Sequence, residues 1–101
     1  MHGRLASIED APADGERTEV LAGARSFTVE QILSGRLVAP HDYVQDHDEW
    51  VVVLHGGAVL EVGGVAHELG AGDWWWLPAG TPHRLVRTEP GTSWLAVSST
   101  G

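Results

Sequence analysis

Residues 72–83 read G-D-W-W-W-L-P-A-G-T-P-H, which combines a strand, a tight turn and the start of a second strand. Gly72 turns the chain into a short strand rich in tryptophan. Pro78 and Gly80 then form a tight turn, because proline presets φ and glycine tolerates positive φ. His83 begins the returning strand. Its spacing from this turn predicts that the His83 ring points into the interior of a β-structure.

Outside this stretch the chain is a series of short β-prone runs separated by turn residues. Eight runs are expected to form strands: TEVLA, SFTVEQILS, DEWVVVLHG, AVLEV, VAHEL, DWWWLP, HRLVR and SWLAVS. Many short strands with almost no helix predict an all-β sandwich or barrel. Between AVLEV and VAHEL, Gly63 and Gly64 predict a hairpin with a type I′ turn, which requires positive φ at both residues.

The composition predicts one soluble domain. A chain of 101 residues suits a single core. Residues 1–17 are expected to form an N-terminal segment, a loop with either a short helix or a strand, and residues 18–101 the barrel domain. The net charge of −8 disfavours nucleic acid and anionic membrane surfaces as partners. Because no apolar run is long enough for a leader or a membrane span, a cytoplasmic location is expected.

The stretch ending at His83 resembles the second conserved motif of the cupin family. That family usually has asparagine four residues after the histidine, where this chain has Arg87. The sequence Glu49-WVVVLH-Gly56 resembles the second half of the first cupin motif. The resemblance covers roughly residues 25–98, and it implies a single-domain, all-β cupin jelly-roll β-barrel with a site inside the barrel.

The first half of the first motif departs from the family pattern. Counting back from Glu49, the two expected histidines fall on Tyr43 and Gln45, whereas counting forward from Gly35 places them on His41 and Tyr43. The segment Y-V-Q-D-H-D-E-W is similar to a Y-D-Q-x-x-D-E-W segment of a subgroup of small cupins, which favours the first register. This resemblance implies no established activity.

The candidate metal ligands are Gln45, Glu49, His83 and His47, with Tyr43 as the candidate catalytic residue. Alternate residues of a strand share a face, although the acidic run predicts a bend near residues 46–48. A mixed nitrogen and oxygen set suits a divalent transition metal, namely Mn, Fe, Ni, Zn or Cu. Tyr43 would act as a general acid or as an orienting donor.

Structural alternatives stand beside this interpretation. Glu49 would need no metal if it paired with Arg84 or Arg87 across the barrel. His47 lies between two aspartates, and such loop histidines are more often solvated than bound to a metal. Without a metal, the same polar residues would form a hydrogen-bonding set for a ligand.

Three functions remain open at this level. The first is a metal-dependent enzyme of dioxygenase, isomerase or lyase type that acts on a small organic molecule. The second is a non-catalytic module that binds or senses a small molecule, and the third is a purely structural dimer. Trp74 and Trp76 share one strand face and Trp75 the other, so an outer tryptophan face is expected to make the protein a homodimer.

Overall fold

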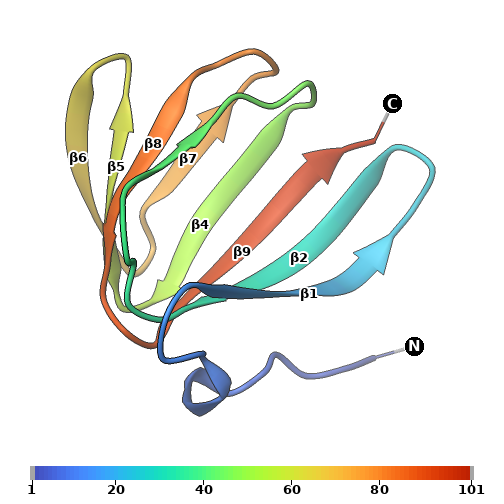
Figure 1. The fold of residues 1–101 in the computed structure, drawn as a ribbon. Helices are drawn as coiled ribbons and strands as arrows, with labels where there is room; N and C mark the ends of the chain where they lie inside the picture. Colours follow the sequence, from blue (N-terminus) through green and yellow to red (C-terminus); the bar gives the residue numbers. More distant parts are fainter. Residues whose placement is uncertain (1, 101) are drawn as a thin grey trace.

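Nine β-strands and one turn of 3₁₀ helix make up the fold of residues 2–100, the part of the chain that the computed structural model describes (Figure 1). The elements are η1 (Ile8–Asp10), β1 (Glu16–Gly23), β2 (Phe27–Ser34), β3 (His41–Tyr43), β4 (Glu49–His55), β5 (Gly57–Val62), β6 (Val65–Gly70), β7 (Trp74–Leu77), β8 (His83–Thr88) and β9 (Thr92–Ser99). All eight expected strands are present, and β3 is an additional one. Among these residues, no helical segment has the length and apolarity that a membrane crossing requires.

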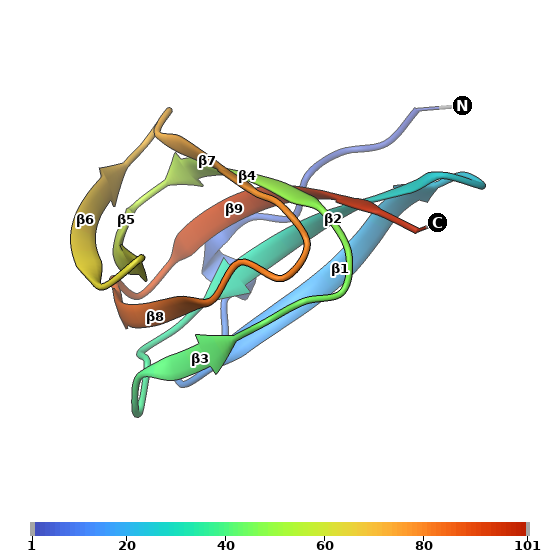
Figure 2. The same cartoon turned by 90° about the horizontal axis from the view of Figure 1, so that it is seen from above.

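The strands form two sheets that face each other (Figure 2). One sheet has five strands in the order β1-β2-β9-β4-β7, and the other has four in the order β3-β8-β5-β6. Every neighbouring pair is antiparallel. Because strands close in space are distant in sequence, the topology is that of the predicted jelly-roll barrel. The all-β prediction is confirmed.

The core lies between the sheets and follows the period of two along each strand. On β4, Val51 and Val53 are buried, whereas Trp50 and Val52 on the opposite face are only partly covered. The buried apolar side chains come from both sheets and are Val51, Val53, Ala58, Leu60, Leu69, Leu77, Leu85, Trp94 and Ala96. The predicted division of the tryptophans is also confirmed, because Trp75 packs against this cluster.

The hairpin between β5 and β6 turns at its two glycines as predicted. Val62 pairs with Val65, so Gly63 and Gly64 form a two-residue link. Their φ angles are 61° and 79°, which only glycine adopts at little cost. This tight link fixes the register of the two strands, as a type I′ turn does.

The segment before β1 is attached to the outer face of the five-stranded sheet. The side chain of Gln31 donates to the carbonyl of Ala6 at 3.1 Å and accepts from its amide at 2.8 Å. Gly35 N donates to the carbonyl of Gly15 at 2.7 Å. Strand β1 then begins at Glu16, two residues before the position where the sequence suggested that the barrel starts.

Replacing Gly35 with alanine is expected to destabilise the fold, because the site has no room for a Cβ. A Cβ there would overlap the carbonyl oxygen of Pro12 and lie 2.7 Å from that of Ala13. We expect Gly35→Ala to lower the free energy of unfolding by about 1–3 kcal/mol in urea denaturation. Gly23→Ala is the control, since nothing lies within 4 Å of a Cβ there. Equal stabilities of the two variants would show that the N-terminal segment does not pack here in solution.

Candidate functional site

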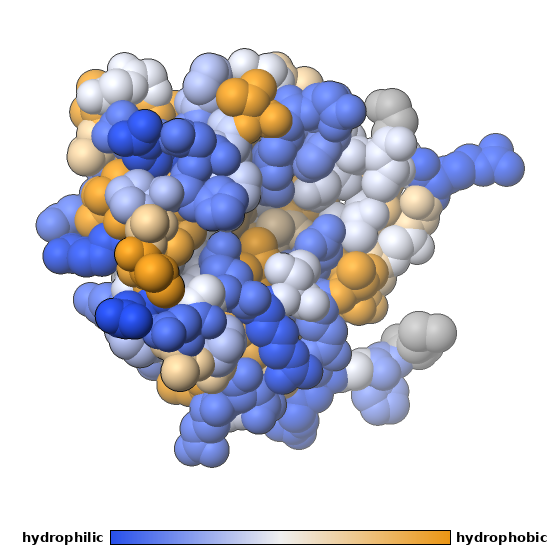
Figure 3. Space-filling view, viewed as in Figure 1, coloured by the Kyte–Doolittle hydropathy of each residue, from blue (hydrophilic) through white to orange (hydrophobic). Residues whose placement is uncertain are grey.

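A cavity opens between the two sheets and has a polar and an apolar part. Its volume, counted as the space that the centre of a water-sized sphere can occupy, is about 100 Å³. This space is enough for several waters or a small molecule. Figure 3 shows a recess on the face seen in Figure 1, with apolar surface at its floor and hydrophilic residues around it. The lining residues are Glu16, Ile32, Tyr43, Gln45, Glu49, Val51, Leu60, Leu77, His83, Leu85 and Trp94.

Backbone contacts bring the two sequence motifs together at this cavity. Gly80 N donates to the carbonyl of Gln45 at 2.7 Å, and Ala79 N donates to Asp48 Oδ1 at 2.8 Å. The turn can present both amides because Gly80 adopts a φ of 79°. The predicted bend is present at residues 46–47 and lets Asp48 reach the turn. Together these contacts hold Gln45 opposite the start of β8.

His83 is buried at the first position of β8, with 8% of its surface exposed. Its Nδ1 lies 3.0 Å from the carbonyl oxygen of Thr81. A carbonyl only accepts, so Nδ1 carries the hydrogen and Nε2 of the neutral ring keeps a lone pair. The ring also stacks on Tyr43, its partner in the ladder between β3 and β8, with centroids 5.3 Å apart. The imidazole is therefore held in one orientation.

Gln45 and Glu49 form the second part of the polar wall. Gln45 Nε2 and Ser98 Oγ each donate to Glu49 Oε2 at 3.4 Å. Gln45 Oε1 is buried and has no hydrogen-bond partner. An unsatisfied buried carbonyl costs about 1–3 kcal/mol. Gln45 lines the cavity, so a donor or a cation beside this oxygen would satisfy it.

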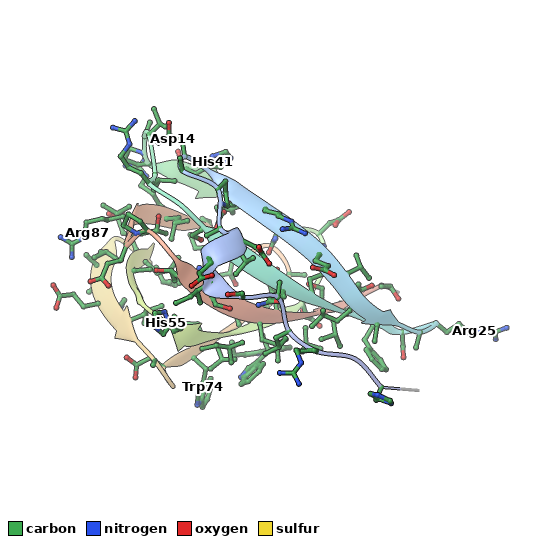
Figure 4. The ribbon with its side chains drawn as sticks, turned by 90° about the horizontal axis from the view of Figure 1, so that it is seen from below. Asp14, Arg25, His41, His55, Trp74 and Arg87 are labelled. Carbon is green, nitrogen blue, oxygen red and sulfur yellow. The ribbon has the colours of Figure 1, made fainter. Side chains whose placement is uncertain are left out.

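The alternative pairing of Glu49 with an arginine is not observed among residues 2–100. Arg84 Nε instead donates to Asp42 Oδ1 at 2.7 Å, on the outside of the barrel. This contact holds the pKa of Asp42 below its ordinary value. Arg87 also projects away from the barrel (Figure 4). The carboxylate of Glu49 thus faces the cavity without a cationic side chain.

Glu16 belongs to the cavity although no sequence motif marks it. Its Oε1 accepts from Tyr43 Oη at 3.4 Å and its Oε2 from Ser34 Oγ at 2.6 Å. Burial, then the charge and hydrogen bond of Glu16 and the charge of Glu49, raises the pKa of Tyr43 to about 12. Tyr43 is therefore a neutral phenol at pH 7. The contact joins edge strands of two different sheets, β1 and β3, and no local pattern predicts it.

The structure brings together Tyr43, Gln45, Glu49 and His83 but leaves two other histidines outside. The His47 ring lies 3.3 Å from Asp46 Oδ1, and His47 does not line the cavity. His41 is exposed and stacks on the outer side of the Tyr43 ring, with centroids 4.9 Å apart. The cavity therefore corresponds to the register that aligns Tyr43 and Gln45 with the family's two histidines.

The donor set contains few groups that bind metals strongly. Within residues 2–100, no cluster of three or more His, Cys, Asp or Glu side chains is placed to hold a metal ion. Gln45, Glu49 and His83 all line the cavity, and Gln45 Oε1 adds a third candidate donor to the carboxylate and the imidazole. That amide oxygen is the buried atom without a partner, so it fits a cation. One nitrogen and two oxygens suit a borderline divalent ion.

Comparison with known proteins identifies the family. The cupin domain model matches residues 28–98. The chain belongs to the cupin family. A candidate mannose-6-phosphate isomerase from Ralstonia eutropha has a similar structure, with a TM-score of 0.83 and 30% identity, over 98% of this chain and 100% of that one.

Two less similar proteins share the fold alone. KdgF from Halomonas sp. has a TM-score of 0.73 and 20% identity, over 84% of this chain and 80% of its own. The polyketide cyclase RemF from Streptomyces resistomycificus has a TM-score of 0.67 and 22% identity, over 98% and 80%. No curated protein matches the chain.

The ionisation of Tyr43 is expected to occur near pH 12 rather than near pH 10. Tyr43 is the only tyrosine of the chain, so the ultraviolet absorbance of tyrosinate reports on it alone. Glu16→Gln should move the midpoint toward 10 without reaching it, because burial and Glu49 still act. Because folding raises the pKa of Tyr43, the protonated phenol contributes to the free energy of unfolding. This contribution is complete below pH 10 and is lost between pH 10 and pH 12.

The matched control is Glu19→Gln, which removes an exposed carboxylate from the same strand. That variant should titrate as the wild type does. A wild-type midpoint near 10 would contradict the buried contact between Tyr43 and Glu16.

Proposed function

We propose that this cupin acts on a small organic molecule in the barrel cavity, with a divalent transition metal bound by Gln45, Glu49 and His83. The unpaired, buried Gln45 Oε1 carries the proposal, because it lies in a wall that also holds a carboxylate and an oriented imidazole. A cation there would satisfy the amide oxygen and offset the charge of Glu49. His47 is not part of this set, since it lies away from the cavity.

The surrounding residues hold these three ligands in place. The carbonyl of Thr81 fixes the tautomer of His83 so that Nε2 is free to bind. Ser98 and the amide of Gln45 orient Glu49 from one side, which leaves its other oxygen available. A metal bound here would supply Lewis acidity to a substrate oxygen.

Among the three reaction types considered, isomerase or lyase chemistry is favoured over oxygenation. A carboxylate, an imidazole and a neutral phenol are groups that move or hold protons. Tyr43 lies at one end of the polar wall, and its contact with Glu16 keeps the phenol proton on Oη of Tyr43. The relative with 30% identity is a candidate isomerase, which supports this choice. The apolar floor excludes water from part of the substrate.

A metal-free binding module is the second candidate function, and the composition of the wall favours it. Apart from Glu16, the wall has one imidazole, that of His83, and one carboxylate, that of Glu49. The neutral amide of Gln45 is a weak metal ligand. In this case Tyr43, Gln45, Glu49 and His83 would bind the ligand by hydrogen bonds alone. The metal content of the protein separates the two functions.

Metal analysis of protein purified without a chelator or a histidine tag is expected to give about one transition metal per chain. His83→Ala and Glu49→Gln should each weaken metal affinity at least tenfold, roughly the effect of losing a ligand or its support. His55→Ala is the control, because His55 is exposed and lies outside the cavity. Absence of metal, even after loading with Mn, Fe, Ni, Cu and Zn in turn, would favour the binding module.

We also propose that a second copy of the chain covers the outer face of the five-stranded sheet at its β4–β7 end, away from the N-terminal segment. Trp74 and Trp76 on the edge strand β7 are 59% and 51% exposed, and Trp74 projects away from the barrel (Figure 4). The pairing continues this apolar row inward, from Trp76 to Trp50 and on to Val97. A chain with a net charge of −8 associates with itself best through an uncharged face.

Light scattering at high protein concentration is expected to give a mass about twice the 10.8 kDa of the chain. Replacing Trp74 and Trp76 with glutamine should convert the dimer to monomer, because the exposed indoles form the apolar row. Val65→Gln changes an equally exposed apolar residue on the other sheet and should leave the dimer intact. A wild-type protein that is monomeric at every concentration would rule this interface out.

A further inference from the structure

Apart from Gln45 Nε2 and Trp94 Nε1, which donate to Glu49 and Ser34, the polar side chains of the cavity wall offer hydrogen-bond acceptors. Gln45 Oε1 and the carboxylate of Glu49 only accept. His83 uses its Nδ1 hydrogen on the carbonyl of Thr81, which leaves Nε2 as an acceptor. Tyr43 directs its hydroxyl hydrogen toward Glu16, so that its oxygen also accepts. An occupant therefore has to supply the hydrogens, the positive charge or both.

The wall also contains no cationic side chain. The chain has six arginines and no lysine, and no arginine is among the residues that line the cavity. Arg84 and Arg36 pair with Asp42 and Asp14 outside it, and Arg25 and Arg87 project into solvent (Figure 4). A phosphate or carboxylate on a ligand would meet two glutamates and no cationic side chain.

Glu16 is the cavity carboxylate that lies outside the proposed metal site. Its two oxygens are held by Ser34 and Tyr43, and Ser34 Oγ in turn accepts from Trp94 Nε1 at 3.0 Å. This network fixes the carboxylate at the rim, between the ring of Tyr43 and the wall that contains Trp94. Glu16 also precedes residues 28–98, the part matched by the family model. It is thus a feature of this chain beyond the cupin motifs.

We propose that Glu16 determines the specificity of the cavity, and that the ligand is a small molecule with a protonated amino group on a short apolar body. The ammonium group would donate to the carboxylate of Glu16, next to the hydroxyl of Tyr43, and form a charge-assisted hydrogen bond there. The body would contact apolar side chains such as Leu77 and Leu85. A space of about 100 Å³ limits the body to a few carbon atoms.

The inference rests on the proposed function only in that a small molecule occupies the cavity, and it does not require the metal. Glu16 lies on a strand that is exposed along its length, so solvent screens its charge. A partly exposed ion pair contributes less than a buried one. The expected effect of Glu16 is therefore a severalfold to tenfold preference rather than an absolute one.

The test compares butylammonium with butyrate, two probes of similar length and opposite charge. Binding is followed at low ionic strength by the NMR signals of the Tyr43 ring, in the metal state in which the protein is purified. We expect butylammonium to bind about tenfold more tightly than butyrate. Glu16→Gln should reduce this ratio to below about threefold, because glutamine still accepts from Ser34 but carries no charge.

Glu19→Gln is the matched control, since it removes the same charge from an exposed position on β1 and should leave the ratio unchanged. Equal or tighter binding of butyrate would overturn the inference. So would an ammonium preference that persists in Glu16→Gln, because the preference would then arise from Glu49. If neither probe binds, both this inference and the proposed small-molecule function fail. If the protein contains no metal and still prefers butylammonium, only the proposed metal site is contradicted.

Discussion

Two hydrogen bonds from one turn hold the site together. Gly80 N donates to the carbonyl of Gln45, and Ala79 N donates to the carboxylate of Asp48. Strand β4, which carries Glu49, belongs to the five-stranded sheet, and β8, which carries His83, belongs to the other. No ladder joins these strands, so contacts between loops set the distance between their side chains at the mouth of the barrel. The positive φ of Gly80 is the backbone condition for both contacts.

The second constraint is the excess of acceptors inside the barrel. A buried amide oxygen without a partner destabilises the fold unless something in the cavity supplies a hydrogen or a charge. This requirement underlies both the proposed metal ion and the proposed ammonium ligand, which satisfy different acceptors of one wall. Gln45, Glu49 and His83 form one end of this wall, and Glu16 forms the other. Both ends of the wall favour positive charge.

Local patterns predicted most of the fold and part of the site. Alternation and turn residues predicted all eight longer strands, and the spacing of residues 72–83 predicted the buried His83. Strand β3 was not predicted, because three residues are too few to show a period, and its pairing with β8 is long-range. Glu16 was missed for a related reason. Its partners Ser34 and Tyr43 are distant in sequence, and no rule of local spacing connects them.

The position of Glu16 follows from how the barrel closes. Strands β1 and β3 are edge strands of different sheets, and each pairs with only one neighbour. Between these two edges the contact of Tyr43 with Glu16 is made by side chains, at a donor–acceptor distance of 3.4 Å. Such a contact is weaker than a backbone ladder and leaves more room beside it. The carboxylate of Glu16 therefore lies where edge strands of the two sheets are joined by side chains, which makes the proposed selectivity a consequence of the topology.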